Sequence, residues 1–324
     1  MTNRTVSVAM CTYNGIAFLK KQLDSIIRQT KPVDEIVICD DRSKDATCEL
    51  IRAFIKECPV KTKFIENPVN LGYTLNFEQA ISLCSGDIIF LSDQDDIWMP
   101  HKVETVCRFF EQHADKDMVF TNAELINAFD VKSYDQTLFD VVDMNHKNKQ
   151  IIREGYGYDV FCACGRVTGS TVAIRASFIP YCIPFPKMSV KTIHDEIMAI
   201  CAVTRNKIDF IDECLIRYRL HANQSVGISL LFKFPPKEHE APENLRLWQE
   251  NIVRGNRKAM ELMQFVHKRF WTFHRRGNLL HFLKMFLSKE YTRHHHNPSN
   301  VFLRDMKGVF RRIVDKMKKK DENI

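Results

Sequence analysis

Two periodicities of apolar residues alternate along the first hundred residues. Short continuous apolar runs, which are typical of buried strands, predict four strands, at 6–10, 35–39, 63–65 and 87–91. Between these runs apolar residues recur every three or four positions, which predicts three amphipathic helices, at 18–27, 46–56 and 75–84. Strands that alternate with helices of this length form parallel sheets with right-handed crossovers. The pattern therefore predicts an α/β protein with a mostly parallel, doubly wound, Rossmann-like sheet.

Clusters of polar side chains follow three of the predicted strands. These clusters are Thr12-Tyr13-Asn14, Asp40-Asp41 and Asp93-Gln94-Asp95-Asp96. In open α/β sheets the carboxyl ends of parallel strands meet at one edge, and ligands bind just beyond that edge. We therefore expect the three clusters to converge on a single binding site.

The sequence lacks the glycine-rich loops that usually hold nucleotide phosphates. No GxGxxG follows the first strand, and GxxxxGK[ST] occurs nowhere in the chain. A divalent cation that bridges carboxylates to phosphates is the economical alternative. Mg²⁺ and Mn²⁺ prefer oxygen ligands and often use only one or two protein carboxylates. The acidic cluster at 93–96 is therefore predicted to bind Mg²⁺ or Mn²⁺.

Seven segments, in a fixed order, carry a resemblance to a known family. They are VSVAMCTYNG (6–15), VICDDRSKDAT (37–47), NLGYTLNFEQA (70–80), GDIIFLSDQDDIWMPHK (86–102), VTGST (167–171), HDEIMAICA (194–202) and YRLHANQSVG (218–227). The chain resembles the family 2 glycosyltransferases with the GT-A fold. The resemblance is greatest to their bacterial rhamnosyltransferase-like branch, in which DQDD, a His-Asp pair and a Tyr-Arg-x-His segment occur together. We expect residues 1–227 to form one GT-A domain, of which the resemblance covers 5–227.

The resemblance implies roles for residues at the matching positions. Those implied to bind the nucleotide sugar are Thr12, Tyr13 and Asn14 beside the nucleotide, Asp41 on the base, Asn70, and Asp93 facing the ribose or the sugar. Asp95 is implied as the direct metal ligand of the DxD element. His221 is implied to lie near the diphosphate and to join the metal shell. Asp195 is implied as the catalytic base.

Several of these residues also fit simpler structural roles, which the sequence leaves open. Those residues are Asp40 and Asp41 as turn formers, Asn70 as a turn residue, Asp96 as an N-cap of the helix after residue 100, Asp195 as a helix cap, and His221 as a surface histidine. Capping and catalysis are compatible for Asp195, because a helix N-terminus favours an ionised carboxylate. Glu196 is its rival for the role of base.

The chemistry of glycosyl transfer calls for the residue types found in these segments. A Lewis-acidic cation absorbs the negative charge that develops on a leaving nucleoside diphosphate. A positioned carboxylate takes the proton of the attacking acceptor hydroxyl. One carboxylate acting once, as Asp195 would, fits a single inverting displacement.

The charge of the chain is unevenly distributed. Residues 228–324 contain 21 Lys and Arg against 10 Asp and Glu, a net charge of +11, whereas residues 1–227 contain 26 against 30, a net charge of −4. Basic and apolar residues recur at helical spacing in this C-terminal region, which predicts basic amphipathic helices. Such helices bind anionic membrane surfaces, although packing on the catalytic domain or on a second subunit would bury them equally well.

The sequence as a whole predicts an inverting, metal-dependent glycosyltransferase. It would move rhamnose or another hexose from a nucleoside diphosphate to a glycan or lipid-linked acceptor in bacterial surface polysaccharide synthesis. No signal peptide or membrane span is recognisable, so we expect a cytoplasmic protein, peripheral at the inner face of the cell membrane.

Two other functions, a sugar nucleotidyltransferase and a non-catalytic binding module, remain as alternatives. A sugar nucleotidyltransferase would need a basic phosphate-binding loop near the N-terminus, and the turn after the first strand offers no basic residue before Lys20. A non-catalytic module would bind through the basic tail. Nucleic acid is not expected as a partner, because convergent carboxylates repel phosphates unless a cation intervenes.

Overall fold

The structure, a computed structural model, describes residues 4–161, 166–185, 193–221 and 224. The predicted basic helical region at 228–324 lies outside the described residues, and its structure stays a prediction. No described helix combines the length and the apolar character that crossing a membrane requires.

Strands and helices alternate through the first half of the described chain. Their order and bounds are β1 (Val6–Thr12), α1 (Leu19–Ile27), β2 (Glu35–Asp40), α2 (Thr47–Glu57), β3 (Lys61–Glu66), α3 (Tyr73–Leu83), β4 (Ile88–Ser92), β5 (Ile97–Trp98) and α4 (Lys102–Gln112). The second half contains β6 (Met118–Ile126), β7 (Lys132–Thr137), α5 (Leu138–Val141), α6 (His146–Arg153), α7 (Tyr158–Phe161), η1 (Gly169–Thr171), β8 (Val172–Arg175), η2 (Ala176–Tyr181), α8 (His194–Val203) and β9 (Ile208–Arg219).

The described strands form one sheet in the order β3-β2-β1-β4-β8-β6-β9-β5, with β7 paired to β6. Strands β3, β2, β1 and β4 are parallel to one another, and β9 is parallel to β6. Strand β8 runs antiparallel to both β4 and β6, so it is inserted against the common direction. The predicted α/β fold with a mostly parallel sheet is confirmed.

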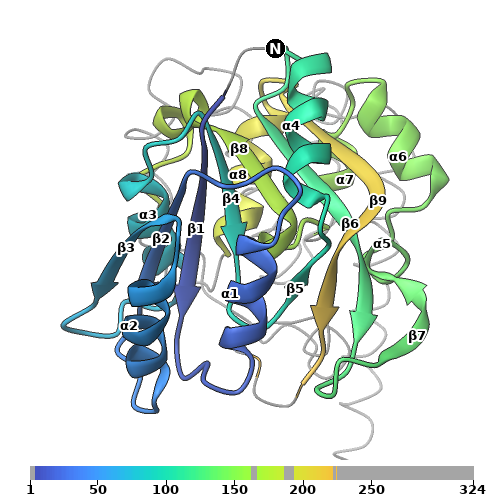
Figure 1. The fold of residues 1–324 in the computed structure, drawn as a ribbon. Helices are drawn as coiled ribbons and strands as arrows, with labels where there is room; N and C mark the ends of the chain where they lie inside the picture. Colours follow the sequence, from blue (N-terminus) through green and yellow to red (C-terminus); the bar gives the residue numbers. More distant parts are fainter. Residues whose placement is uncertain (1–3, 162–165, 186–192, 222–223, 225–324) are drawn as a thin grey trace, which may run out of the picture.

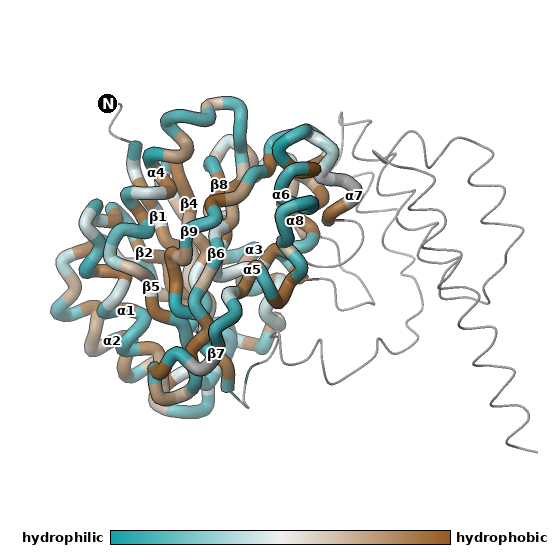
Figure 2. Tube along the Cα trace, turned by 90° about the vertical axis from the view of Figure 1, so that its right-hand side faces the viewer, coloured by the Kyte–Doolittle hydropathy of each residue, from teal (hydrophilic) through white to brown (hydrophobic). Residues whose placement is uncertain are grey.

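Helices cover both faces of this sheet, with α1, α2 and α4 in front and α8 behind in the view of Figure 1. Every residue of β1, β2 and β4 is buried, as expected for strands covered on two sides. The edge strand β3 is only partly buried. The hydropathy along the trace follows this layering, because the central strands are largely hydrophobic and α6, on the outside, is hydrophilic (Figure 2).

The amphipathic pattern of the first helix decides which of its faces meets the sheet. In α1 the side chains of Leu19, Leu23 and Ile26 are fully buried, while Lys20 and Lys21 face outward. This spacing of three and four residues places the apolar side chains on one stripe. The stripe fixes α1 beside the ends of β1 and β5, where the candidate site begins.

Candidate active site

The ends of β1 and β2 bring the first two polar clusters together. Thr12 pairs with Asp40 in the parallel register, and its Oγ1 donates a hydrogen bond to Asp40 Oδ2 at 2.7 Å. Asp40 also accepts bonds from the backbone N–H and the hydroxyl of Ser43, at 2.7 and 2.6 Å. Asp40 is therefore a turn former, one of the simpler roles that the sequence allows it.

The third cluster is joined to the first by one side chain. Gln94 accepts from the backbone N–H of Tyr13 at 2.8 Å and donates to its carbonyl at 2.9 Å. Next to this pair, a Cβ added to Gly15 would lie 2.0 Å from Gln94 Oε1, so any larger residue would displace the end of the Gln94 side chain. Asn14 adopts a positive φ of 49° and holds the next turn through Ser43 and Lys44. The loops after β1 and β4 thus form one connected edge.

Asp41 organises the loop that precedes α3. Its carboxylate accepts from the backbone N–H groups of Leu71 at 2.6 Å and Gly72 at 2.8 Å, and from the amide of Asn67 at 3.1 Å. The Asn70 side chain donates to the Asp41 carbonyl at 3.0 Å. Asp41, after β2, and Asn70, before α3, therefore link two loops, and their roles toward a nucleotide stay predictions.

Three carboxylates lie together in the loop between β4 and β5. One carboxylate oxygen each from Asp93, Asp95 and Asp96 lies within 4.8 Å of the others. Burial, and then the charges of Asp95 and Asp96, raise the pKa of Asp93 well above its ordinary value. Burial and the charge of Asp95 likewise raise the pKa of Asp96 to about 7. Concentrated negative charge of this kind is costly unless a cation neutralises it.

The donor set of this loop fits a hard divalent cation. All its ligand atoms are oxygens, which Mg²⁺ and Mn²⁺ prefer. Asp96 Oδ2 is buried and has no hydrogen-bond partner among the described residues, and a buried acceptor without a partner is what a bound cation would satisfy. The residues present therefore fit the predicted metal.

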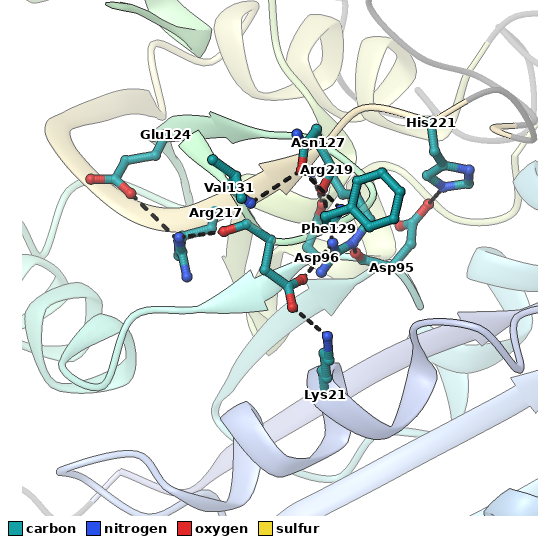
Figure 3. Close-up of polar contacts among 11 residues, drawn as sticks. Lys21, Asp95, Asp96, Glu124, Asn127, Phe129, Val131, Arg217, Arg219 and His221 are labelled. Atoms are coloured by element: carbon teal, nitrogen blue, oxygen red, sulfur yellow. Dashed lines mark hydrogen bonds and ion pairs between the residues drawn. The ribbon is translucent and has the colours of Figure 1, made fainter. Parts of the chain in front are cut away.

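His221 approaches this loop from the end of β9. Its Nε2 lies 2.8 Å from Asp95 Oδ2 (Figure 3). Its ring centre also lies 4.8 Å from that of Phe18. The His221 side chain is mostly buried, so the alternative of a surface histidine is wrong. Two predicted metal-shell residues from distant segments are thus in direct contact.

Asp96 does not cap the helix that follows. Helix α4 begins at Lys102 with His101 at its N-cap and has no side-chain cap. Asp96 Oδ1 instead accepts from the backbone N–H of Arg219 at 2.9 Å. The N-cap alternative for Asp96 is therefore wrong, because the carboxylate lies against the end of β9.

Asp195 lies in the first turn of α8 and is only 6% exposed. The N-cap of α8 is Ile193, so Asp195 does not occupy the cap itself. Burial, and then the charge of Glu196, raise the pKa of Asp195 to about 8. The charge of Asp195 also contributes to the raised pKa of Asp93. The predicted base and the acidic loop are therefore close enough to interact electrostatically.

Lys102 is a charged residue of the site that sequence reasoning missed. It is fully buried, its Nζ donates to the Ser170 carbonyl at 3.0 Å, and it lies 4.2 Å from the centre of the Trp98 ring. Burial lowers the pKa of Lys102 to about 7, against the opposing effect of Asp96 and Asp93. Its place at the end of the segment GDIIFLSDQDDIWMPHK is the feature of the sequence that could have identified it as a site residue.

Arg219 and Tyr218 were missed as well. Both are buried at the end of β9, within the segment YRLH that supplied His221. Burial, and then the charges of Asp96 and Asp93, raise the pKa of Tyr218 well above its ordinary value, which places its hydroxyl in the field of the acidic loop. Contacts from β9 thus complete a site that β1, β2 and β4 begin.

Comparison with known proteins identifies the family of the chain. The family model "Glycosyl transferase family 2" matches residues 7–172. The dTDP-rhamnosyl transferase RfbG of Shigella flexneri is 30% identical over 238 residues, which cover 69% of this chain and 75% of RfbG. An uncharacterised glycosyltransferase of Nostoc sp. is 27% identical over 217 residues, which cover 67% of this chain and 65% of the Nostoc protein.

A solved structure shares the fold. The crystal structure of Staphylococcus aureus TarS residues 1–349, in complex with UDP-GlcNAc, matches with a TM-score of 0.58 and 18% identity. The match covers 93% of this chain and 81% of that one. The family model spans half of this chain, and the RfbG match spans more than two thirds of it. The chain belongs to glycosyl transferase family 2.

Proposed function

We propose that the protein is a metal-dependent, inverting glycosyltransferase that transfers a hexose from a nucleoside diphosphate sugar to a hydroxyl of a glycan or lipid-linked acceptor. The observation that carries this proposal is the acidic loop of Asp93, Asp95 and Asp96 with buried Asp195 in its electrostatic reach. A cation site alone would account only for the binding of a nucleoside diphosphate. A cation site beside a carboxylate with a raised pKa provides both a leaving-group site and a base.

Asp95 and His221 would hold the cation, with Asp93 toward the ribose or the sugar. The bound Mg²⁺ or Mn²⁺ would supply Lewis-acid stabilisation of the departing diphosphate. Thr12, Tyr13 and Asn14 would flank the nucleotide, Asp41 would hydrogen-bond the base, and Asn70 would lie beside the nucleotide sugar. Their connections through Gln94 and Ser43 fix these loops before the donor binds, which reduces the ordering cost of binding.

Asp195 would remove the proton of the acceptor hydroxyl as that oxygen attacks the anomeric carbon. The bond between the anomeric carbon and the phosphate oxygen breaks, and the nucleoside diphosphate leaves with its electron pair. Attack from the face opposite the leaving group inverts the anomeric configuration. A carboxylate whose pKa is raised to about 8 is a stronger base than an ordinary Asp, so burial serves the reaction at the expense of stability.

Rhamnose is the first donor sugar to test. The support is the match to RfbG, named as a dTDP-rhamnosyl transferase, over more than two thirds of this chain. The acceptor class rests on the family resemblance of the motifs alone.

The proposal is tested with a panel of nucleotide sugars, dTDP-rhamnose included, scored for nucleoside diphosphate release with Mn²⁺ or Mg²⁺ in the presence of candidate acceptors. Asp95→Asn should lose metal-dependent donor binding. Asp195→Asn should keep donor binding and lose turnover by about 10²-fold or more. Asp115→Asn, at a largely exposed position, is the matched control. Near-normal turnover by Asp195→Asn would show that Asp195 is not the base.

A further inference from the structure

Arg219 is, with Lys102, one of two fully enclosed basic side chains near the acidic loop among the described residues. It is 0% exposed, and its guanidinium contacts two segments that are far from β9 in sequence. Its Nε donates to the carbonyl of Asp95 at 2.5 Å, and its Nη1 donates to the carbonyl of Asn127 at 3.0 Å. Figure 3 shows these contacts meeting at one guanidinium between the acidic loop and the turn that joins β6 to β7.

The backbone of Arg219 holds the next residue of the same loop. Its N–H donates to Asp96 Oδ1 at 2.9 Å. One residue therefore fixes the Asp95 peptide through its side chain and the Asp96 carboxylate through its main chain. His221, two residues further on, then meets the Asp95 carboxylate at 2.8 Å. The relative position of the two proposed cation ligands thus depends on how Arg219 is held.

Arg219 is held by the turn between β6 and β7. Its Nη1 lies 2.6 Å from Asp130 Oδ1, and Asp130 also pairs with Lys21 of α1. Asp130 takes a positive φ of 66°, which is uncommon for a residue other than glycine. Burial would raise the pKa of Asp130, but its bonds to Lys21 and Arg219 hold that pKa below its ordinary value. Asp130 is therefore an ionised anchor for the guanidinium.

The face of the guanidinium is covered by Phe18, whose ring centre lies 4.6 Å from Arg219 Cζ. The same ring lies 4.8 Å from the ring of His221. Phe18 thus limits the movement of both the anchor and the proposed ligand. Arginine suits this position because its rigid planar fork donates in several fixed directions, whereas lysine has a single flexible ammonium group.

We propose that Arg219 is a positioning residue for the cation site. It fixes the Asp95 peptide and the Asp96 carboxylate, with Asp130 as its anchor, so that Asp95 and His221 are presented to the cation in one geometry. This inference rests on the proposed function, in which Asp95 and His221 are cation ligands. It adds that the turn at 127–130 determines cation affinity without contributing a ligand.

The test measures Mn²⁺ binding to the full chain, without any sugar nucleotide, by the electron paramagnetic resonance signal of free Mn²⁺. Arg219→Lys should raise the Kd for Mn²⁺ about 10- to 100-fold, the usual effect of removing a residue that orients a metal ligand. Arg217→Lys is the matched control. Arg217 lies on the same strand and contacts the same turn, through the Asp130 carbonyl at 2.9 Å, and it pairs with Glu124. Its substitution should leave the Kd within about twofold, by the same comparison.

The unfolding midpoint of each variant, measured beside its Kd for Mn²⁺, shows whether a change in binding is distinct from a loss of stability. A folded Arg219→Lys variant whose Kd stays within twofold of the wild type would overturn the inference, even if its midpoint falls. If Arg219→Lys does not fold, Asp130→Asn decides, because it removes the anchor and leaves the bond to the Asp95 carbonyl. An unchanged Kd in Asp130→Asn would then overturn the inference.

Asp95→Asn distinguishes this inference from the proposed function. If the wild type binds Mn²⁺ no more tightly than Asp95→Asn does, the proposed cation site is wrong and the inference falls with it. If wild-type binding depends on Asp95 but survives Arg219→Lys, the cation site stands and the positioning role alone is overturned.

Discussion

At the scale of single residues, Asp195 lies in an environment that penalises its charge. Burial, and then Glu196, raise its pKa from 3.8 to about 8. In the unfolded chain this carboxyl ionises near pH 3.8, so between pH 3.8 and 8 unfolding releases a proton. The folded state therefore loses stability as the pH rises through that window.

Asp195→Asn should remove this pH-dependent penalty, because the amide carries no charge at any pH. Relative to the wild type, we expect its free energy of unfolding to rise between pH 5 and pH 8, by about 2–4 kcal/mol, and to change little above pH 8. Urea unfolding at several pH values measures this difference. Asp115→Asn, largely exposed, should show no such trend. A difference between Asp195→Asn and wild type that is the same at pH 5 and pH 8 would contradict the raised pKa.

Sequence reasoning at this scale succeeded for residues that follow strands and failed for residues that tertiary packing buries. The convergence of the clusters that contain Thr12, Asp40 and Asp93 was predictable, because the ends of parallel strands share an edge of the sheet. The burial of Lys102 was not, since lysine is ordinarily exposed. It is buried here because the carbonyl of Ser170, from a distant segment, and the ring of Trp98, four residues earlier, enclose it.

At the scale of elements, Glu35 joins the starts of several strands. Its carboxylate is buried and accepts from the hydroxyl of Ser7 at 2.8 Å and from the backbone N–H of Ser85 at 2.7 Å. Lys63 of β3 lies 3.1 Å away. Burial opposes ionisation, but the bonds from Ser85, Ser7 and Lys63 outweigh it and lower the pKa of Glu35 to about 2.

Glu35→Gln should destabilise the sheet at neutral pH and have little effect in acid. The stabilisation from a lowered pKa is fully present above about pH 4.5 and is lost as the pH falls toward 2. We expect a loss of about 2–3 kcal/mol at pH 7 that shrinks as the pH falls from 4.5 to 3, measured by urea unfolding. Glu57→Gln, on an exposed position of α2, is the control. A loss that stays constant with pH would show that Glu35 acts through packing alone.

The contact between the loops after β1 and β4 gives a second prediction for elements. A Cβ at residue 15 would displace Gln94, and Gln94 holds Tyr13 by two hydrogen bonds. Gly15→Ala and Gln94→Ala should therefore each raise the KM for the sugar nucleotide, by about 5- to 30-fold for one or two lost bonds. The double variant should be no worse than either single one, because both changes remove the same contact. Additive losses would mean that the two residues act independently.

The limits of sequence reasoning about elements have a physical cause. β1, β2 and β4 were predictable because strands covered on both faces consist of unbroken apolar runs. β8 is four residues long, which is too short to display a period. The pairing of β9 with β6 shifts in register near Asn122, and such irregularities depend on the neighbouring strand rather than on local sequence.

At the scale of the whole molecule, the charge of residues 228–324 predicts where the protein acts. Each basic residue close to an anionic surface contributes about 1 kcal/mol, and this region has a net charge of +11. We expect the full chain to float with vesicles that contain anionic lipid and to be released by salt. It should not float with neutral vesicles. Equal recovery with both kinds of vesicle, or with neither, would contradict the proposed docking.

The reversed direction of β8 has a consequence for how this enzyme can diverge. Because β8 runs against β4 and β6, the residues before it, rather than those after it, arrive at the edge of the sheet that carries the proposed active site. Those residues include Gly169, whose backbone bonds Asp195, and Ser170, whose carbonyl accepts from Lys102. Natural variation or engineered insertions just upstream of Val172 should therefore alter turnover. Insertions directly after Arg175, at the start of η2 (Ala176–Tyr181), emerge at the opposite end of the sheet and should leave turnover intact.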